Sequence, residues 1–324
     1  MKKTITESPV ANGENARQEA AAFVESIANN PTVTRLAEGM GYVNSETDDV
    51  SEKLAALKAF SNQEWDFRNG KERQDTSGTE FDAIQSAAIF EAAQEWNMVE
   101  SSEPSKTHYD FVTVLGGANK SPLLRVRYAK EQMEKHNLEV PYMVLLGSSR
   151  PLSDAEKNNT KDYALGAEDE FSLMNGAVET EFGISHTDEK IIDLHNFSPK
   201  ATDKDMWRVR YYEATNGMHI LSVSAPQIEG ERRVNTADTY RFMDEVVGHE
   251  MLNDANVLNV TNAHFVPFQN ADAERLLGLK ANAHVETIGY SADYAGITRK
   301  PHELLQEMNS AINQTVLLQQ ALEQ

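Results

Sequence analysis

Two periodicities divide the chain. Between about Glu14 and Met98, apolar residues recur every three or four positions, the spacing of one face of an α-helix. Beyond a polar linker at 101–106, short β-branched apolar runs alternate with helical segments. This change predicts a helical N-terminal region at 1–105 and an α/β domain at 106–324.

The N-terminal pattern predicts four helices, and residues 1–13 are expected to be disordered. The helices are expected at 14–28, 36–42, 51–60 and 81–98, with a polar loop at 68–78.

The second region predicts a mainly parallel sheet with helices on both faces, because buried strands alternate with helices. Five such strands are expected at 110–115, 141–147, 190–195, 256–262 and 284–290. Helices are expected at 121–136, 168–182, 235–247, 272–279 and 301–322, with a polar loop after 151. Two β-rich runs, 207–215 and 218–224, flank Asn216-Gly217, which predicts an inserted β-hairpin.

The first buried strand ends in a glycine turn that leads into a helix. Gly116 and Gly117 let the chain turn sharply. Ser121 is the expected N-cap and Pro122 the expected first helical residue, with Arg125 in the turns that follow. Backbone N–H groups at such a junction favour anions. An ordinary strand-to-helix turn without a ligand explains the same residues.

Arginines follow several of the strand ends, which is where ligands of parallel sheets lie. Arg125, Arg150, Arg232 and Arg233 all occupy such positions in an otherwise acidic chain. They suggest a local positive basin for a phosphate or a carboxylate. The alternative is that each arginine pairs with one of the many carboxylates.

Other residues near the strand ends are candidate binding or catalytic residues that are not arginines. Asn235 and Thr236 begin a helix. They either cap it or belong to a helix N-terminus whose N–H groups bind an anion. Glu170 lies near a helix start, where the dipole favours a carboxylate, and could hold a ribose hydroxyl or orient an arginine. His264 could move a proton, although a single histidine is more often structural.

Several catalytic motifs are missing from the sequence. Gly147-Ser148-Ser149 is not a nucleophile elbow, and His249-Glu250 lacks the second histidine of a zinc helix. The sequence contains no P-loop, no Gly-x-Gly-x-x-Gly and no recognisable triad. A classical NAD or ATP site is therefore not expected.

Composition narrows the class of protein. The 324 residues are 40% apolar and carry a formal net charge of −21. This acidity argues against nucleic-acid binding and against docking on anionic lipid. Without cysteine, neither a disulfide nor a thiolate site can form. No signal peptide or membrane-length apolar run is found, so we expect a cytoplasmic protein without a membrane partner.

The order of the strand-end motifs resembles that of the YdcF/SanA/ElyC family of bacterial proteins. The similar features are Leu115-Gly116-Gly117, Arg125 before Ala129, Glu170 with Met174, the loop 233–239 and the segment 261–267. Gly147-Ser148-Ser149 stands where that family has Ser-Gly-Gly, and Phe268 where it has arginine. The resemblance covers about 108–290 and implies a Rossmann-like domain.

These observations leave two main hypotheses. The first is a YdcF-like protein, with or without catalytic activity, that binds a small anion such as a nucleotide or S-adenosylmethionine. Its candidate ligand-binding residues are Gly116, Gly117, Arg125, Gly147, Ser148, Arg150, Arg232, Asn235 and Thr236, with His264 and Glu170 as candidate catalytic residues. The second is a non-catalytic scaffold whose helical N-terminal region docks a partner. Phosphoester hydrolysis would need a metal or a nucleophile that the sequence does not place.

Overall fold

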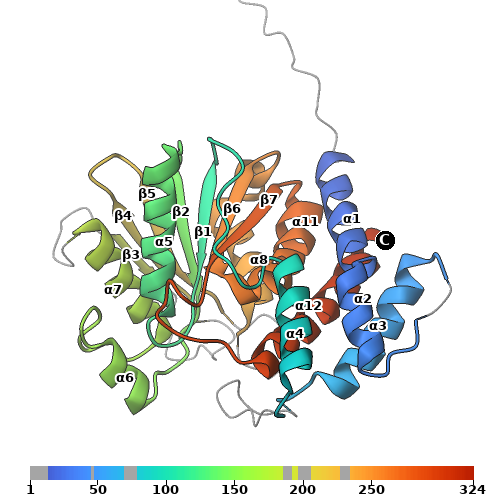
Figure 1. Ribbon diagram of the computed structural model, residues 1–324. Coiled ribbons are helices and arrows are strands. Elements are labelled where there is room, and N and C mark those ends of the chain that lie inside the picture. Colours follow the sequence, from blue (N-terminus) through green and yellow to red (C-terminus); the bar gives the residue numbers. More distant parts are fainter. Residues whose placement is uncertain (1–13, 45–46, 69–78, 185–191, 196–205, 227–233) are drawn as a thin grey trace, which may run out of the picture.

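A seven-stranded, mostly parallel sheet is the centre of the molecule (Figure 1). The computed structural model describes residues 14–44, 47–68, 79–184, 192–195, 206–226 and 234–324. The strands are β1 (Phe111–Leu115), β2 (Tyr142–Gly147), β3 (Ile192–His195), β4 (Arg208–Glu213), β5 (His219–Ser224), β6 (Asn256–Asn262) and β7 (His284–Tyr290). Their spatial order is β3-β4-β5-β2-β1-β6-β7. Only the β3–β4 and β4–β5 pairs are antiparallel among these strands.

Helices connect and flank the strands. The N-terminal set is α1 (Glu14–Ala28), α2 (Pro31–Gly39), α3 (Val50–Glu64) and α4 (Ala83–Glu95). The later helices are α5 (Ser121–His136), α6 (Asp154–Thr160), α7 (Glu170–Phe182), α8 (Thr236–Val247), α9 (His249–Leu252), α10 (Val266–Ala273), α11 (Leu279–Ala281) and α12 (Pro301–Leu322). A 3₁₀ turn, η2 (Ala263–Phe265), precedes α10, and a π-helical turn, η3 (Glu274–Gly278), follows it. In the described part of the chain, no helix is both long and apolar enough to cross a membrane.

Strand alternation builds two cores, one on each face of the sheet. Along β1, Val112 and Val114 pack with α5 and α7, whereas Phe111 and Leu115 pack with α8 and η3. Successive side chains of a strand point to opposite faces, and both faces here are covered by helices. The expected sheet with helices on both faces is confirmed in this coarse form.

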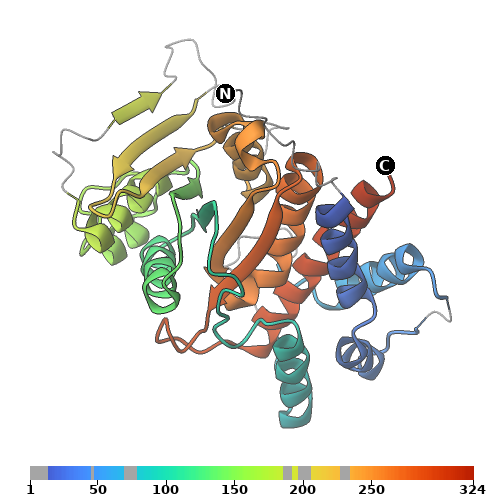
Figure 2. The same ribbon diagram turned by 90° about the horizontal axis from the view of Figure 1, so that it is seen from above.

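The N-terminal helices do not stand apart. Their apolar stripes join the buried side of α12, from Leu304 to Leu318, in a third core. Figure 2 shows these helices gathered around α12, away from the β3–β4 edge. Arg68 reinforces the contact, since its Nη2 lies 2.6 Å from an oxygen of Glu307. The domain boundary at 105/106 stays a prediction.

The hairpin is integrated in the sheet. β4 and β5 pair around Asn216-Gly217, with Gly217 at a φ of +83°, as the Asn-Gly signal predicts. However, β5 also pairs with β2 in parallel, register Tyr142 to His219. The hairpin therefore extends the main sheet instead of forming a separate insertion.

Several expected boundaries are wrong. Helix α5 begins at Ser121 itself, and Lys120 precedes it without a side-chain cap. The polar stretch after Pro151 contains α6, which a capping box between Ser153 and Glu156 starts. The helices expected at 36–42 and 272–279 begin earlier, at Pro31 and Val266, and each has a proline in its first turn. The segment 1–13 and most of the loop 68–78 lie outside the described residues.

A buried carboxyl lies where α1 meets the sheet. Glu274 in η3 is 3% exposed, and its Oε2 has no hydrogen-bond partner among the described residues. Burial, and secondarily the nearby Glu19 carboxylate, raises the pKa of Glu274 to about 8. The native protein therefore holds a neutral carboxylic acid there at pH 7.

We predict that Leu305→Ala lowers the free energy of unfolding by roughly 2–5 kcal/mol. Leu305 is 0% exposed in the core that α12 shares with the N-terminal helices. The matched control is Leu317→Ala on the same helix, where the side chain is 39% exposed. Urea denaturation measures both, and equal losses would contradict this packing.

We also predict that Glu274→Gln stabilises the protein increasingly as pH rises from about 4.5 to about 8. The unfolded chain releases this proton near the ordinary glutamate pKa of 4.5, whereas the native protein keeps it to about 8. Wild-type stability is thus lost over that window, by about 1.4 kcal/mol per unit of pKa displacement. Denaturation curves at several pH values measure the effect, with exposed Glu250→Gln as control. A pH-independent difference between Glu274→Gln and wild type would refute it.

Candidate functional site

The carboxyl ends of the parallel strands lie along the lower edge of the sheet in Figure 1. Side chains of α7 occupy the two glycine turns there. A Cβ on Gly116 would lie 2.1 Å from Oε1 of Glu170, and one on Gly147 would lie 2.4 Å from Sδ of Met174. The glycines therefore make room for side chains of α7. Glu170 and Met174 are four residues apart on this helix, so one of them reaches each glycine turn.

Arg125 is a structural tie at the same edge. Its side chain is 3% exposed, and Nη1 donates to the carbonyl oxygens of Leu115 (2.9 Å) and Gly116. Nε donates to Oδ1 of Asn262 at 2.8 Å, and the amide of Asn262 donates to the hydroxyl of Tyr290 at 2.7 Å. This chain of bonds joins the ends of β1, β6 and β7.

Arg150 is held by a carboxylate. Its two terminal nitrogens bond both oxygens of Glu156, at 3.1 and 2.8 Å. Burial raises the pKa of Glu156, but the Arg150 bonds and those from Ser153 outweigh it and lower the pKa to about 2. Glu170 lies beside the pair, 3.8 Å from Nε of Arg150, and accepts a 2.7 Å bond from Ser148. The carboxylate-pairing alternative therefore describes Arg150.

Asn235 and Thr236 begin α8 through a capping box. Oδ1 of Asn235 accepts from the N–H of Asp238 at 3.1 Å, and Asp238 accepts from the N–H of Asn235 at 3.0 Å. This is the capping role that the sequence left open for Asn235. Arg232 and Arg233 lie outside the described residues, so the positive basin is not tested at those two positions.

A pocket opens at the other end of this edge, outside β6 and β7. It measures about 120 Å³. His264, in the turn directly after β6, is 6% exposed, and its ring is tilted by 46° against that of Phe265 with the ring centroids 3.8 Å apart. The segment 291–299 after β7 supplies Asp293 and Arg299, and its turn is closed by the bond from Gly296 N to Asp293 O at 2.9 Å.

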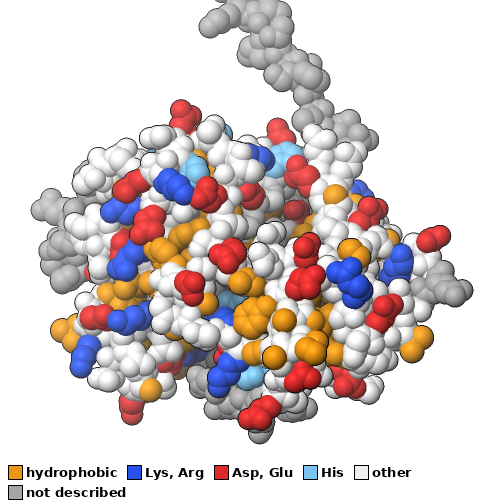
Figure 3. Space-filling view, in the orientation of Figure 1, with side chains coloured by type: hydrophobic (Ala, Val, Ile, Leu, Met, Phe, Trp, Pro, Cys, Tyr) orange, Lys and Arg blue, Asp and Glu red, His pale blue; other side chains and the backbone are white. Residues whose placement is uncertain are grey.

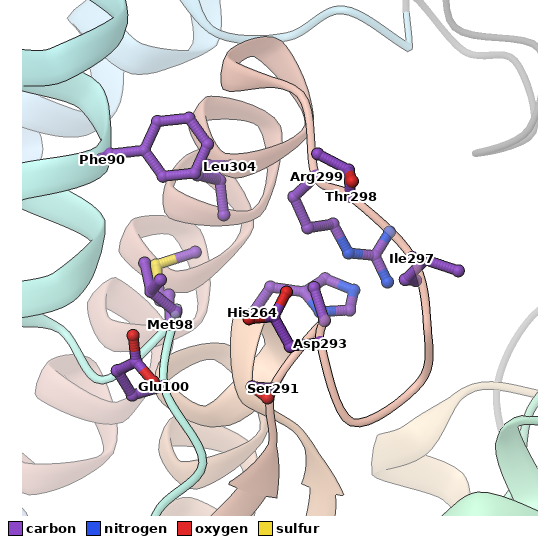
Figure 4. Close-up of a pocket in the computed structure, with 12 residues that line it drawn as sticks. Phe90, Met98, Glu100, His264, Ser291, Asp293, Ile297, Thr298, Arg299 and Leu304 are labelled. Carbon is purple, nitrogen blue, oxygen red and sulfur yellow. The ribbon is translucent and has the colours of Figure 1, made fainter.

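The N-terminal region supplies the opposite wall of this pocket. Phe90 comes from α4 and Met98 and Glu100 from the segment that follows it, while Leu304 comes from the first turn of α12. Figure 4 shows Phe90, Met98 and Leu304 on one side of the hollow and Arg299 on the other, with His264 and Asp293 between them. The pocket therefore needs both sequence regions.

Of the candidate residues that the structure describes, only His264 lines this pocket. Gly116, Gly117, Arg125, Gly147, Ser148, Arg150 and Glu170 form the neighbouring packed edge, and Asn235 and Thr236 begin α8. Phe265 lies between the packed edge and the pocket. Its ring is 5.9 Å from the guanidinium carbon of Arg125, and it is the neighbour of His264. Sequence reasoning missed Arg299 and Asp293. Both follow the predicted strand that ends at Tyr290, so the search for charged residues after strand ends could have included them.

Charge on the visible surface is mixed. Figure 3 shows acidic and basic side chains interspersed over this face, so a site for an anion has to be local. Among the residues that the structure describes, no group of three His, Asp or Glu side chains is arranged to hold a metal ion.

We predict that Gly116→Ala destabilises the protein by roughly 1–3 kcal/mol, because the new methyl group collides with Glu170. The cost should fall in a Glu170→Ala background, but not vanish, since the Leu146 carbonyl lies 3.0 Å from the same Cβ position. Gly39→Ala, with nothing within 4 Å, is the control. Urea denaturation of the four-member cycle tests this, and strict additivity would contradict it.

Comparison with known proteins gives a different relationship from the one that the motifs suggest. Residues 11–97, which include α1 to α4, match the family model described as Rv3785 N-terminal domain. The chain is 29% identical to "Uncharacterized protein Rv3785" of Mycobacterium tuberculosis and to "Uncharacterized protein Mb3814" of Mycobacterium bovis, over 96% of its own length and 92% of theirs. No solved structure matches the chain.

The expected resemblance to the YdcF/SanA/ElyC family is thus wrong. The matching family model and the full-length relatives are of the Rv3785 type. The motifs that suggested the resemblance have a packing explanation here, because Gly116 and Gly147 face Glu170 and Met174. By sequence, this chain is similar to Rv3785 and its counterpart in Mycobacterium bovis.

Proposed function

We propose that the chain binds a small anionic ligand in the pocket outside β6 and β7, with Arg299 as the cationic contact. One observation carries this proposal: the guanidinium of Arg299 is poorly satisfied. Its Nε is buried without a hydrogen-bond partner in the described part of the chain, and its ion pair with Glu303 spans 3.9 Å. An incompletely bonded guanidinium costs free energy, and an anion in the pocket would supply an acceptor to the exposed part of this side chain, which is 23% exposed.

The topology supports a strand-end site next to β6, the strand that the pocket shares with the point where the direction of winding reverses. Numbered along the chain, the five mutually parallel strands β1, β2, β5, β6 and β7 have the spatial order 3-2-1-4-5. We therefore propose a Rossmann-like arrangement, in which the direction of winding reverses at β1. Ligands of doubly wound sheets bind outside the strand ends at that reversal. His264 follows β6, the neighbour of β1, and offers an imidazole for proton transfer.

Size limits what the pocket can enclose. An engineered protein cavity of about 150 Å³ holds one benzene molecule, and this pocket measures about 120 Å³. A nucleotide or S-adenosylmethionine, both proposed ligands, would place only an end group inside it. The anion-binding role moves from Arg125 and Arg150, which have internal acceptors, to Arg299.

We predict that at least one member of a panel of acetate, inorganic phosphate, AMP and S-adenosylmethionine raises the melting temperature. A ligand at a hundred times its Kd adds about 2.7 kcal/mol of stability. Arg299→Gln should weaken that binding about tenfold or more, because a hydrogen bond to a charged group is worth about 1.5–3 kcal/mol.

The matched control is Arg35→Gln, whose side chain is 66% exposed on α2. It should leave the ligand affinity unchanged. The proposal fails if no member of the panel, and no other small anion, shifts the wild-type melting temperature, or if Arg299→Gln binds the hit as tightly as wild type.

A further inference from the structure

The lining of the strand-end pocket is divided by chemistry. The wall formed by Phe90, Met98 and Leu304, called the floor below, is apolar. Met98 is 2% and Leu304 1% exposed. The rim of the pocket carries charges of both signs, Glu100 and Asp293 against Arg299. Figure 4 shows the apolar group and Arg299 on opposite sides of the hollow.

The rim charges do not neutralise each other. Within the described residues, neither Glu100 nor Asp293 forms an ion pair with Arg299, whose one ion pair is the long contact with Glu303. Opposite charges that share a pocket without pairing leave room between them for a ligand that carries both signs. A simple anion would gain Arg299 but would also face two carboxylates.

We propose that the ligand is an α-amino acid with a short apolar side chain. Its carboxylate meets Arg299, its ammonium group meets Asp293 and Glu100, and its side chain enters the floor formed by Phe90, Met98 and Leu304. The proposal rests on the proposed function, because it names the ligand class of the same pocket. The amino-acid end of S-adenosylmethionine carries the same head group.

Volume and burial set the expected side-chain preference. Each methylene that enters the floor should tighten binding about fourfold, so affinity should rise from alanine to valine. A pocket of about 120 Å³ is smaller than a benzene-sized cavity, so phenylalanine should bind less well than valine. The two carboxylates expected to meet the ammonium group, Asp293 and Glu100, are exposed, and exposed ion pairs contribute only up to about fivefold each.

The experiment is a binding series followed by NMR titration of the full-length protein. The ligands are alanine, valine and phenylalanine, together with propionate and 3-methylbutanoate, which are alanine and valine without the amino group. We expect valine to bind roughly fivefold more tightly than 3-methylbutanoate. Asp293→Asn and Glu100→Gln should reduce that ratio towards one, because each removes a contact to the ammonium group of valine and a like-charge repulsion on 3-methylbutanoate.

The controls use exposed positions, so that folding is preserved. Asp293 and Glu100 are both exposed, and Glu95→Gln, an exposed carboxylate of the neighbouring α4, should leave the ratio unchanged. Equal affinity for valine and 3-methylbutanoate overturns the amino-acid assignment but leaves the anion proposal standing. If neither amino acids nor their deaminated forms bind, the amino-acid assignment fails, and the phosphate and nucleotide arms above decide the anion proposal separately.

Discussion

The bonds of Arg125 set the geometry of the strand-end edge at β1, β6 and β7. A buried guanidinium is costly unless its donors are satisfied, and here they reach the carbonyls of β1 and the amide of Asn262 at the end of β6. Asn262 in turn donates a hydrogen bond to Tyr290, which fixes the end of β7 relative to β6. Because His264 follows Asn262 by two residues and the segment 291–299 follows Tyr290 directly, the same bonds position both strand-derived walls of the pocket. Arg125 therefore acts on the site from a distance, as a positioning residue.

The second constraint is the core that α12 shares with the N-terminal helices. Without residues 1–105, the apolar side of α12 from Leu304 to Leu318 would face water, and the pocket would lose Phe90, Met98 and Glu100. Deletion of this region is therefore a poor test of the scaffold hypothesis, since it would remove a partner surface, a core and a wall of the pocket together. Point substitutions at exposed positions such as Val43 and Ile84, 86% and 82% exposed, separate these effects.

Local pattern was enough to predict most elements, but not the pocket. The buried runs of β1, β2, β6 and β7 and the Asn-Gly hairpin follow from residues close in sequence. Helix α6 was missed because its sequence is polar and its start depends on Glu156, which also binds Arg150. Phe90 and Met98 line the same pocket as His264 although they precede it by 174 and 166 positions in the sequence. No local periodicity predicts such a pairing. The resemblance failed for a related reason, because short glycine and glutamate motifs recur wherever a helix packs closely on a strand end.

The arginines show why strand-end position alone does not identify an anion site. An arginine there has three possible fates: it binds main-chain carbonyls, it binds a carboxylate, or it remains for a ligand. Arg125 takes the first and Arg150 the second, and in each case two guanidinium nitrogens are bonded within 3.1 Å. Arg299 differs because its nearest carboxylate lies at 3.9 Å and its Nε is buried and unbonded among the described residues. The informative quantity is therefore the satisfaction of each guanidinium, which depends on which carbonyls and carboxylates the fold brings near. That is a property of tertiary structure, so the sequence could place cations at the strand ends but could not tell which of them the fold would leave with an unbonded buried nitrogen.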